Sequence, residues 1–134
     1  MKKILLIEEN QDLLADMATF LELEGFLVIS ATDGLMGWQI AQECQPELVI
    51  SELKLPKLDG YQLLVKLRKT PQTAKIPLIF ITGWGETENR FQAIALGAND
   101  YLIKPVEITR IIDAIALQFQ YLELNKSTLR LSAI

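Results

Sequence analysis

The stretch Leu48-Val49-Ile50-Ser51-Glu52-Leu53-Lys54-Leu55-Pro56 decides how this chain is expected to fold. Its first three residues form a brief apolar run without alternating polarity, which is typical of a parallel strand buried on both faces. One carboxylate, that of Glu52, follows the run almost directly. The stretch therefore predicts a buried strand whose carboxyl end carries an acidic side chain.

Four other short apolar runs have the same character, and they comprise residues 4–7, 26–29, 78–81 and 101–103. Three of these runs also lead directly into chemically useful side chains, which are Glu8 and Glu9, Thr82, and Lys104 before Pro105. Three acids, a hydroxyl and an amine at strand ends are the groups that phosphoryl chemistry uses for positioning and charge neutralisation.

The segments between these runs have helical spacing of their apolar residues. Gly25 and Gly97 are suited to end the first and fourth helices, and Asp59 is suited to cap the third. The second helix is expected to open near Asp33-Gly34. The residues that define the five helices are Leu13, Leu14, Met17, Phe20 and Leu21; Met36, Trp38, Ile40 and Ala41; Tyr61, Leu64, Val65 and Leu67; Phe91, Ala95 and Leu96; and Ile108, Ile111, Ile112, Ile115 and Phe119.

Strands and helices that alternate five times predict an α/β fold, a doubly wound sandwich with a parallel sheet in the order 2-1-3-4-5. The chain connections in that order reverse direction between the first and third strands, so a crevice opens at their carboxyl ends. Glu8, Glu9 and Glu52 should converge there, with Thr82 and Lys104 on the other side. Three carboxylates repel one another, and a hard cation such as Mg²⁺ would relieve that repulsion.

Simpler explanations exist for each of these residues taken alone. Glu8 and Glu9 could favour the N-terminus of the first helix, and Thr82 is a residue that suits a strand end. Lys104 could be a solvated lysine, and Glu52 an ordinary loop acid. Their expected meeting at one crevice is what favours a functional site.

The composition limits the classes of protein that need to be considered. A chain of 134 residues with a formal charge of −4 suits one domain, and it argues against a basic nucleic-acid-binding face. The single cysteine, Cys44, fits a reducing, cytoplasmic location. The absence of histidine removes catalytic triads and His-ligated metals. No apolar run is long enough to span a membrane, and residues 1–9 do not suit a signal peptide.

Taken together, these motifs resemble the receiver domain of two-component response regulators, which has a flavodoxin-like topology. The resemblance covers roughly residues 2–121, and it predicts a receiver domain at 1–121 with a tail at 122–134 that extends the last helix, frays or docks on a partner. The matching segments are residues 7–10, 46–52, 55–60, 76–77 with 81–82, and 97–105.

The resemblance implies a role for each matching residue. Glu8 and Glu9 correspond to the acidic pair that holds Mg²⁺, and the backbone carbonyl of Lys54 corresponds to a further ligand. Thr82 corresponds to the switch hydroxyl. Lys104 corresponds to the phosphate-contacting lysine, whose peptide bond to Pro105 is typically cis in this family. Tyr101 corresponds to the aromatic residue that turns inward when the family's switch is thrown.

Glu52 departs from the family pattern, because the resemblance places it where an aspartate normally accepts phosphate. Glutamate is one methylene longer, and a misplacement near 1 Å can cost ~100-fold in a reaction that depends on alignment. We therefore expect weak or absent phosphorylation, with the Glu52 carboxylate nearer Lys104 and Thr82. We also expect Mg²⁺ binding to be weakened or absent, whereas the Lys54 side chain could compete with metal or point to solvent.

Three functions are compared on this basis. The leading interpretation is a phosphorylation-independent pseudo-receiver, a protein-interaction module and not an enzyme, which meets a sensor kinase or effector through Phe91–Phe119. A homodimer is a further possible assembly, and neither nucleic acid nor membrane is expected as a partner. The second is a working phosphorelay receiver with a weak or non-standard acceptor. The third, an FMN-binding redox carrier, is disfavoured because the acidic loop at residues 8–12 would repel a phosphate.

Overall fold

The structure is a computed structural model that describes residues 1–85 and 87–132, with the backbone alone for residues 87 and 127–132. Strands and helices alternate throughout this part of the chain, as the sequence predicts. The elements are β1 (Lys3–Ile7), α1 (Gln11–Leu23), β2 (Leu27–Ala31), α2 (Gly34–Cys44), β3 (Leu48–Ser51), α3 (Gly60–Lys69), β4 (Leu78–Thr82), α4 (Thr87–Ala95), β5 (Asp100–Ile103) and α5 (Ile108–Ser132).

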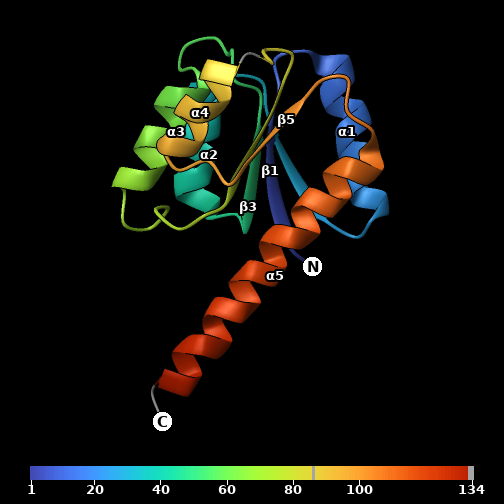
Figure 1. The fold of residues 1–134 in the computed structure, drawn as a ribbon. Helices are drawn as coiled ribbons and strands as arrows, with labels where there is room; N and C mark the ends of the chain where they lie inside the picture. The colour runs from blue at the N-terminus through green and yellow to red at the C-terminus, as the bar shows by residue number, and fades with distance from the viewer. Residues whose placement is uncertain (86, 133–134) are drawn as a thin grey trace.

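The five strands form one parallel sheet in the order β2-β1-β3-β4-β5, which confirms the predicted topology. Helices α2, α3 and α4 cover one face of the sheet, and α1 and α5 cover the other (Figure 1). Each face has its own apolar core, with Phe80 and Tyr101 in the first and Ile50 and Ile115 in the second. The register pairs Ile7 with Ser51, so Glu8 and Glu52 leave neighbouring strands at the same edge.

The predicted helix caps are present. Asp59 caps α3, and its carboxylate accepts a hydrogen bond from the Gln62 amide while the Gln62 side chain accepts one from the Asp59 amide. Asp33 caps α2 in the same way through the Met36 amide. Gly97 has a φ of +108°, a conformation that glycine adopts readily, as expected after a helix.

Two helices pack part of their apolar pattern against the core, with Trp38, Ile40 and Ala41 in α2 and Leu96 directly after α4, and leave one large apolar residue each on the surface. The buried residues of α2 are Gly34, Gly37 and Ala41, whereas Met36 is 42% exposed. In α4, Phe91 is 71% exposed and Ala93 is the residue that packs in the core. Small residues let both helices approach the sheet and leave larger side chains on the surface.

Helix α5 continues well past the sheet and projects from the domain (Figure 1). Of the three expectations for the tail, continuation of the last helix is the one that the structure shows, as far as Ser132. Residues 133–134 lie outside the described part of the chain. In the described residues, no helix has the length and apolar character needed to cross a membrane.

Candidate functional site

Two acidic side chains and one lysine meet at the carboxyl edge of the sheet. Glu8 follows β1, Glu52 follows β3 and Lys104 follows β5, so the topology alone brings them together. The Lys104 Nζ lies 2.6 Å from the Glu8 Oε1 and 2.7 Å from the Glu52 Oε2. The two glutamate side chains are about nine-tenths buried, while that of Lys104 is 26% exposed. The lysine is therefore the shared counter-charge of both acids.

The remaining oxygen of each carboxylate is held by the backbone. The Leu53 amide donates to the Glu52 Oε1 at 2.7 Å, and the Asn10 amide donates to the Glu8 Oε2 at 3.1 Å. Hydrogen bonds to charged acceptors are stronger than those between neutral groups. Each of the four carboxylate oxygens thus already has a donor, and the Glu52 head group is fixed against the start of its own loop.

Electrostatics favour the charged form of Lys104. Burial lowers the pKa of its ammonium group, but the hydrogen bonds and negative charges of Glu52 and Glu8 act in the opposite direction and raise the pKa above its usual value. Lys104 is consequently protonated at neutral pH. The peptide bond between Lys104 and Pro105 is cis, as the family resemblance implies.

The expected Mg²⁺ ligands fit such an ion in chemistry but not in arrangement. Carboxylate oxygens are ligands that Mg²⁺ prefers, but those of Glu8 and Glu52 are occupied by Lys104 and backbone amides. Glu9 is exposed. Within residues 1–85 and 87–132, no three acidic or thiol side chains are grouped so that they could hold a metal. As arranged, the site does not fit a divalent cation.

The Lys54 side chain is exposed and lies beside Trp84. Its Nζ lies 5.1 Å from the centre of the Trp84 ring, within the range of a cation–π contact. Lys54 is exposed to solvent, and none of the ion pairs among the described residues joins it to a carboxylate. Glu8, Glu9, Asn10, Glu52, Lys54 and Trp84 line a shallow cavity of about 400 Å³ at this edge of the sheet.

Thr82 and Tyr101 are connected through the loop that contains Trp84. The fully buried Thr82 hydroxyl accepts a hydrogen bond from the Trp84 amide at 3.2 Å. The Tyr101 hydroxyl donates to the Trp84 carbonyl, and the Tyr101 side chain is 1% exposed, so it points inward. No hydrogen bond between Thr82 and Glu52 is present among the described residues. The loop after β4 therefore links the acidic site to the inner face of β5.

Trp84 is the site residue that the sequence reasoning passed over. The segment Thr82-Gly83-Trp84-Gly85 reads as a flexible loop. One signal was nevertheless available, because a large aromatic residue two positions after a strand end lies close to the crevice by topology. Its contact with Lys54 depends on the path of the loop, which the residue pattern does not specify.

The chain has clear relatives among proteins of known sequence and structure. A sequence model of the response regulator receiver domain matches residues 4–116. The DNA-binding dual master transcriptional regulator RpaA of Synechocystis sp. is 34% identical over 84% of this chain and 46% of its own length. The transcriptional regulatory protein HprR of Escherichia coli is 33% identical over 98% of this chain and 58% of its own length. The chain thus spans about half the length of these curated relatives.

A solved structure has the same fold over almost the whole chain. The receiver domain protein from Clostridium thermocellum superposes with a TM-score of 0.86 at 31% identity, covering 92% of this chain and 98% of that one. The match includes the doubly wound sheet on whose edge the Glu8–Lys104–Glu52 cluster lies. The chain therefore belongs to the response regulator receiver domains of two-component signalling.

Proposed function

We propose that this domain is a phosphorylation-independent pseudo-receiver, which acts as a protein-interaction module and not as an enzyme. The observation that carries the proposal concerns Glu52, the residue at the acceptor position. Both oxygens of its carboxylate already accept hydrogen bonds. One of its oxygens is 2.7 Å from the Lys104 ammonium and the other is 2.7 Å from the Leu53 amide. An incoming phosphoryl group would need one of these oxygens as its nucleophile.

The longer glutamate side chain explains this arrangement. The extra methylene moves the carboxylate outward, toward the lysine that would otherwise contact a phosphoryl group. A carboxylate supplies one negative charge there, compared with about −1.5 to −2 for a phosphoryl group. The inward Tyr101 supports the idea that this partial imitation holds the domain near the switched state.

Lys104 also accounts for the weak metal binding that belongs to this proposal. Its ammonium group pairs with two of the three carboxylates that would attract Mg²⁺ and offsets part of their negative charge. A divalent ion would have to displace a protonated lysine from both acids. We expect Mg²⁺ affinity below that of a receiver with a free acidic pocket.

The proposed docking face is formed by α4, β5 and the first part of α5. It carries large apolar side chains that are partly or mostly exposed, with Phe91 at 71%, Ile94 at 47% and Ile103 at 42%. Contiguous exposed apolar surface is typical of protein-interaction sites. A cytoplasmic sensor kinase, an effector or a second copy of the domain would dock there, with residues 1–121 as the receiver and 122–134 as an extension. Neither nucleic acid nor membrane is included among the proposed partners of this domain.

The proposal is tested by treating the natural chain, Glu52→Asp and Glu52→Gln with acetyl phosphate and Mg²⁺, followed by intact-mass measurement. The natural chain and Glu52→Gln should remain unmodified. Glu52→Asp should gain a phosphoryl adduct, because the shorter side chain draws its carboxylate back from Lys104. A phosphoryl adduct on Glu52 of the natural chain would contradict the proposal and would favour a receiver with a weak acceptor.

A further inference from the structure

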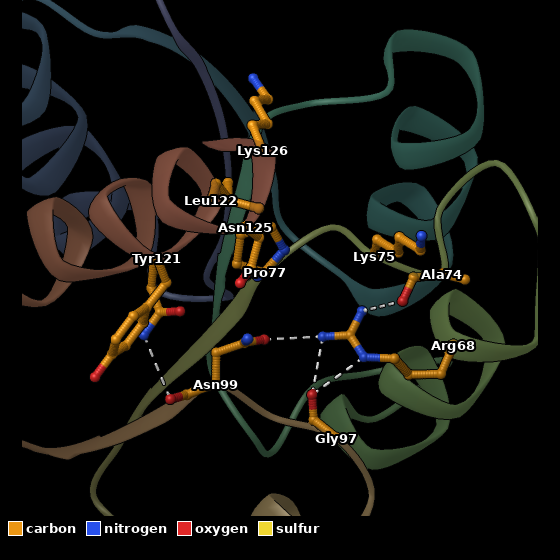
Figure 2. Close-up of a pocket in the computed structure, with 11 residues that line it drawn as sticks. Arg68, Ala74, Lys75, Pro77, Gly97, Asn99, Tyr121, Leu122, Asn125 and Lys126 are labelled. Carbon is orange, nitrogen blue, oxygen red and sulfur yellow. Dashed lines mark hydrogen bonds between the residues drawn. The ribbon is translucent and has the colours of Figure 1, made fainter. Parts of the chain in front are cut away.

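A second cavity lies at the opposite end of the sheet from the acidic site. It has a volume of about 800 Å³ and is bounded by the end of α3, the loops that lead into β4 and β5, and the outer part of α5 (Figure 2). Ligands of doubly wound folds usually bind at the carboxyl ends of the strands. This cavity is at the amino ends of β4 and β5, so it is separate from the site described above.

The floor of the cavity contains a fixed positive charge, the guanidinium group of Arg68. Its Nε donates to the Gly97 carbonyl at 3.1 Å, and its Nη2 donates to the same carbonyl at 2.9 Å and to the Asn99 Oδ1 at 3.0 Å. Its Nη1 donates to the carbonyls of Ala74 at 3.2 Å and Ile76 at 2.7 Å. All five N–H groups of the guanidinium are thus used, and every acceptor is neutral.

This charge has no compensating carboxylate. None of the ion pairs formed by the described residues involves Arg68. Burial lowers the pKa of Arg68, but an arginine stays protonated at neutral pH. Because its donors are already occupied, Arg68 would act on an anion in this cavity through its charge alone, and hydrogen bonds to that anion would have to come from other groups.

The rim of the cavity supplies those other groups. Lys75 and Lys126 are exposed at the rim, on the loop before β4 and on α5, and both side chains extend outward from the cavity (Figure 2). The described lining residues thus include three basic side chains and no acidic one, although the whole chain has a net charge of −4. Glu123 lies 3.7 Å from Lys126, but both side chains are more than 60% exposed, and such pairs contribute little.

The remaining lining combines amides with apolar surface. Asn125 and Gln118 offer amide groups, and Pro77, Tyr121 and Leu122 offer flat or apolar faces. Gln118 is only 5% exposed, and its Nε2 donates to the Asn99 carbonyl at 3.5 Å, which holds α5 against the start of β5. A volume of about 800 Å³ lies within the ~300–1,000 Å³ of small-molecule sites.

We propose that this cavity binds a small phosphorylated compound with a planar ring, of the nucleotide class. The phosphate would lie above the charge of Arg68, and the exposed side chains of Lys75 and Lys126 would turn inward to contact it. The ring would lie against Tyr121 and Pro77, with the amides of Gln118 and Asn125 available to its polar edge. This site is independent of the state of Glu52, so the two proposals can fail separately.

The test is isothermal titration calorimetry of the full chain with three probes: AMP, adenosine and inorganic phosphate. AMP should bind with a Kd below roughly 1 mM, and more tightly than either of its two parts. Lys75→Gln and Lys126→Gln should each weaken AMP binding by roughly tenfold, because each removes a charge-assisted hydrogen bond. Tyr121→Ala should weaken the binding of AMP but not that of phosphate.

Lys69→Gln is the matched control, since it removes one exposed charge from the end of α3 outside the cavity lining. Its affinity for AMP should equal that of the natural chain. The proposal is overturned if AMP shows no binding at millimolar concentration, or if Lys69→Gln and Lys75→Gln bind it equally. It is also overturned if adenosine or phosphate alone binds as tightly as AMP. Circular dichroism of every variant establishes that each is folded before the titrations are compared.

Discussion

The Lys104 ammonium group is the residue-scale feature on which the acidic site depends. Replacing it in Lys104→Met would leave Glu8 and Glu52 close together without their shared cation. Removing one partner of a buried ion pair costs several kcal/mol, and partial exposure of this lysine reduces the cost. We expect the free energy of unfolding of Lys104→Met, measured by urea denaturation at neutral pH, to be about 2 kcal/mol lower than that of the natural chain. Lys69→Met, which removes an exposed lysine, should change it by less than about 0.5 kcal/mol.

The stability difference between the natural chain and Lys104→Met should depend on pH, because Lys104 titrates. Its pKa in the folded protein is raised above the unfolded value of 10.5. The stabilisation is therefore fully present below pH 10.5 and is lost as pH rises through the higher folded pKa. The gap between the natural chain and Lys104→Met should stay constant from neutral pH to about pH 9 and close in strong alkali. A gap that persists unchanged in strong alkali would show that the ion pair is not its source.

The sequence predicted the acidic cluster at the strand ends, but not the contacts of Arg68 or of Lys54. The meeting of Glu8, Glu52 and Lys104 follows from strand order, because each residue directly follows a buried apolar run. Arg68 could not be recognised, because its partners are mainly backbone carbonyls that leave no trace in the residue pattern. The position of Lys54 over Trp84 depends on two loop conformations for the same reason.

At the scale of elements, α2 shows how small residues determine packing. A Cβ added at Gly34 would lie 1.7 Å from the Leu58 carbonyl oxygen, so Gly34→Ala must move either the helix or the loop. We expect Gly34→Ala to lower the free energy of unfolding by about 3 kcal/mol, the upper range for overpacking. Gly83→Ala is the control, because nothing lies within 4 Å of its added Cβ. Chemical denaturation of both variants measures the difference, and equal values would contradict the close approach.

Apolar periodicity located the helices correctly, but in two of them one large apolar residue of the pattern lies on the surface, Met36 in α2 and Phe91 in α4. The pattern of α4 favours Phe91 as a core residue, yet Ala93 is buried and Phe91 is exposed. Hydrophobicity alone cannot distinguish a core side chain from an apolar side chain that stays on the surface. Helix α2 is similar, because its buried glycines carry no hydrophobic signal although Gly37 faces Ile7 of β1 and Gly34 faces the Leu58 backbone.

For the molecule as a whole, the outer part of α5 should be less stable than the domain. Its residues Glu123 to Lys126 are exposed, whereas Ile111 to Gln118 include four side chains that are almost fully buried. Helices gain most of their stability from tertiary packing. Hydrogen exchange followed by NMR should therefore show amides of residues 123–126 exchanging at least roughly 100-fold faster than those of 114–118. Equal protection would indicate that a second copy or another segment covers the extension.

The whole topology was accessible from the sequence because short buried strands alternate with helices. Two connected strands must be joined by a crossover when they are parallel, so the order of elements leaves few arrangements. The length of α5 was not accessible in the same way. The outer part of α5 projects beyond the sheet, so no core-facing stripe is needed to continue it (Figure 1).

The position of Trp84 gives the molecule an intrinsic optical reporter. Its indole is 49% exposed beside the Lys54 ammonium, and its backbone contacts both Thr82 and Tyr101. The chain has two tryptophans, and the other, Trp38, is in α2, so Trp38→Phe would leave Trp84 as the only tryptophan. Its fluorescence would then follow any rearrangement of the loop after β4 in real time, without an attached dye.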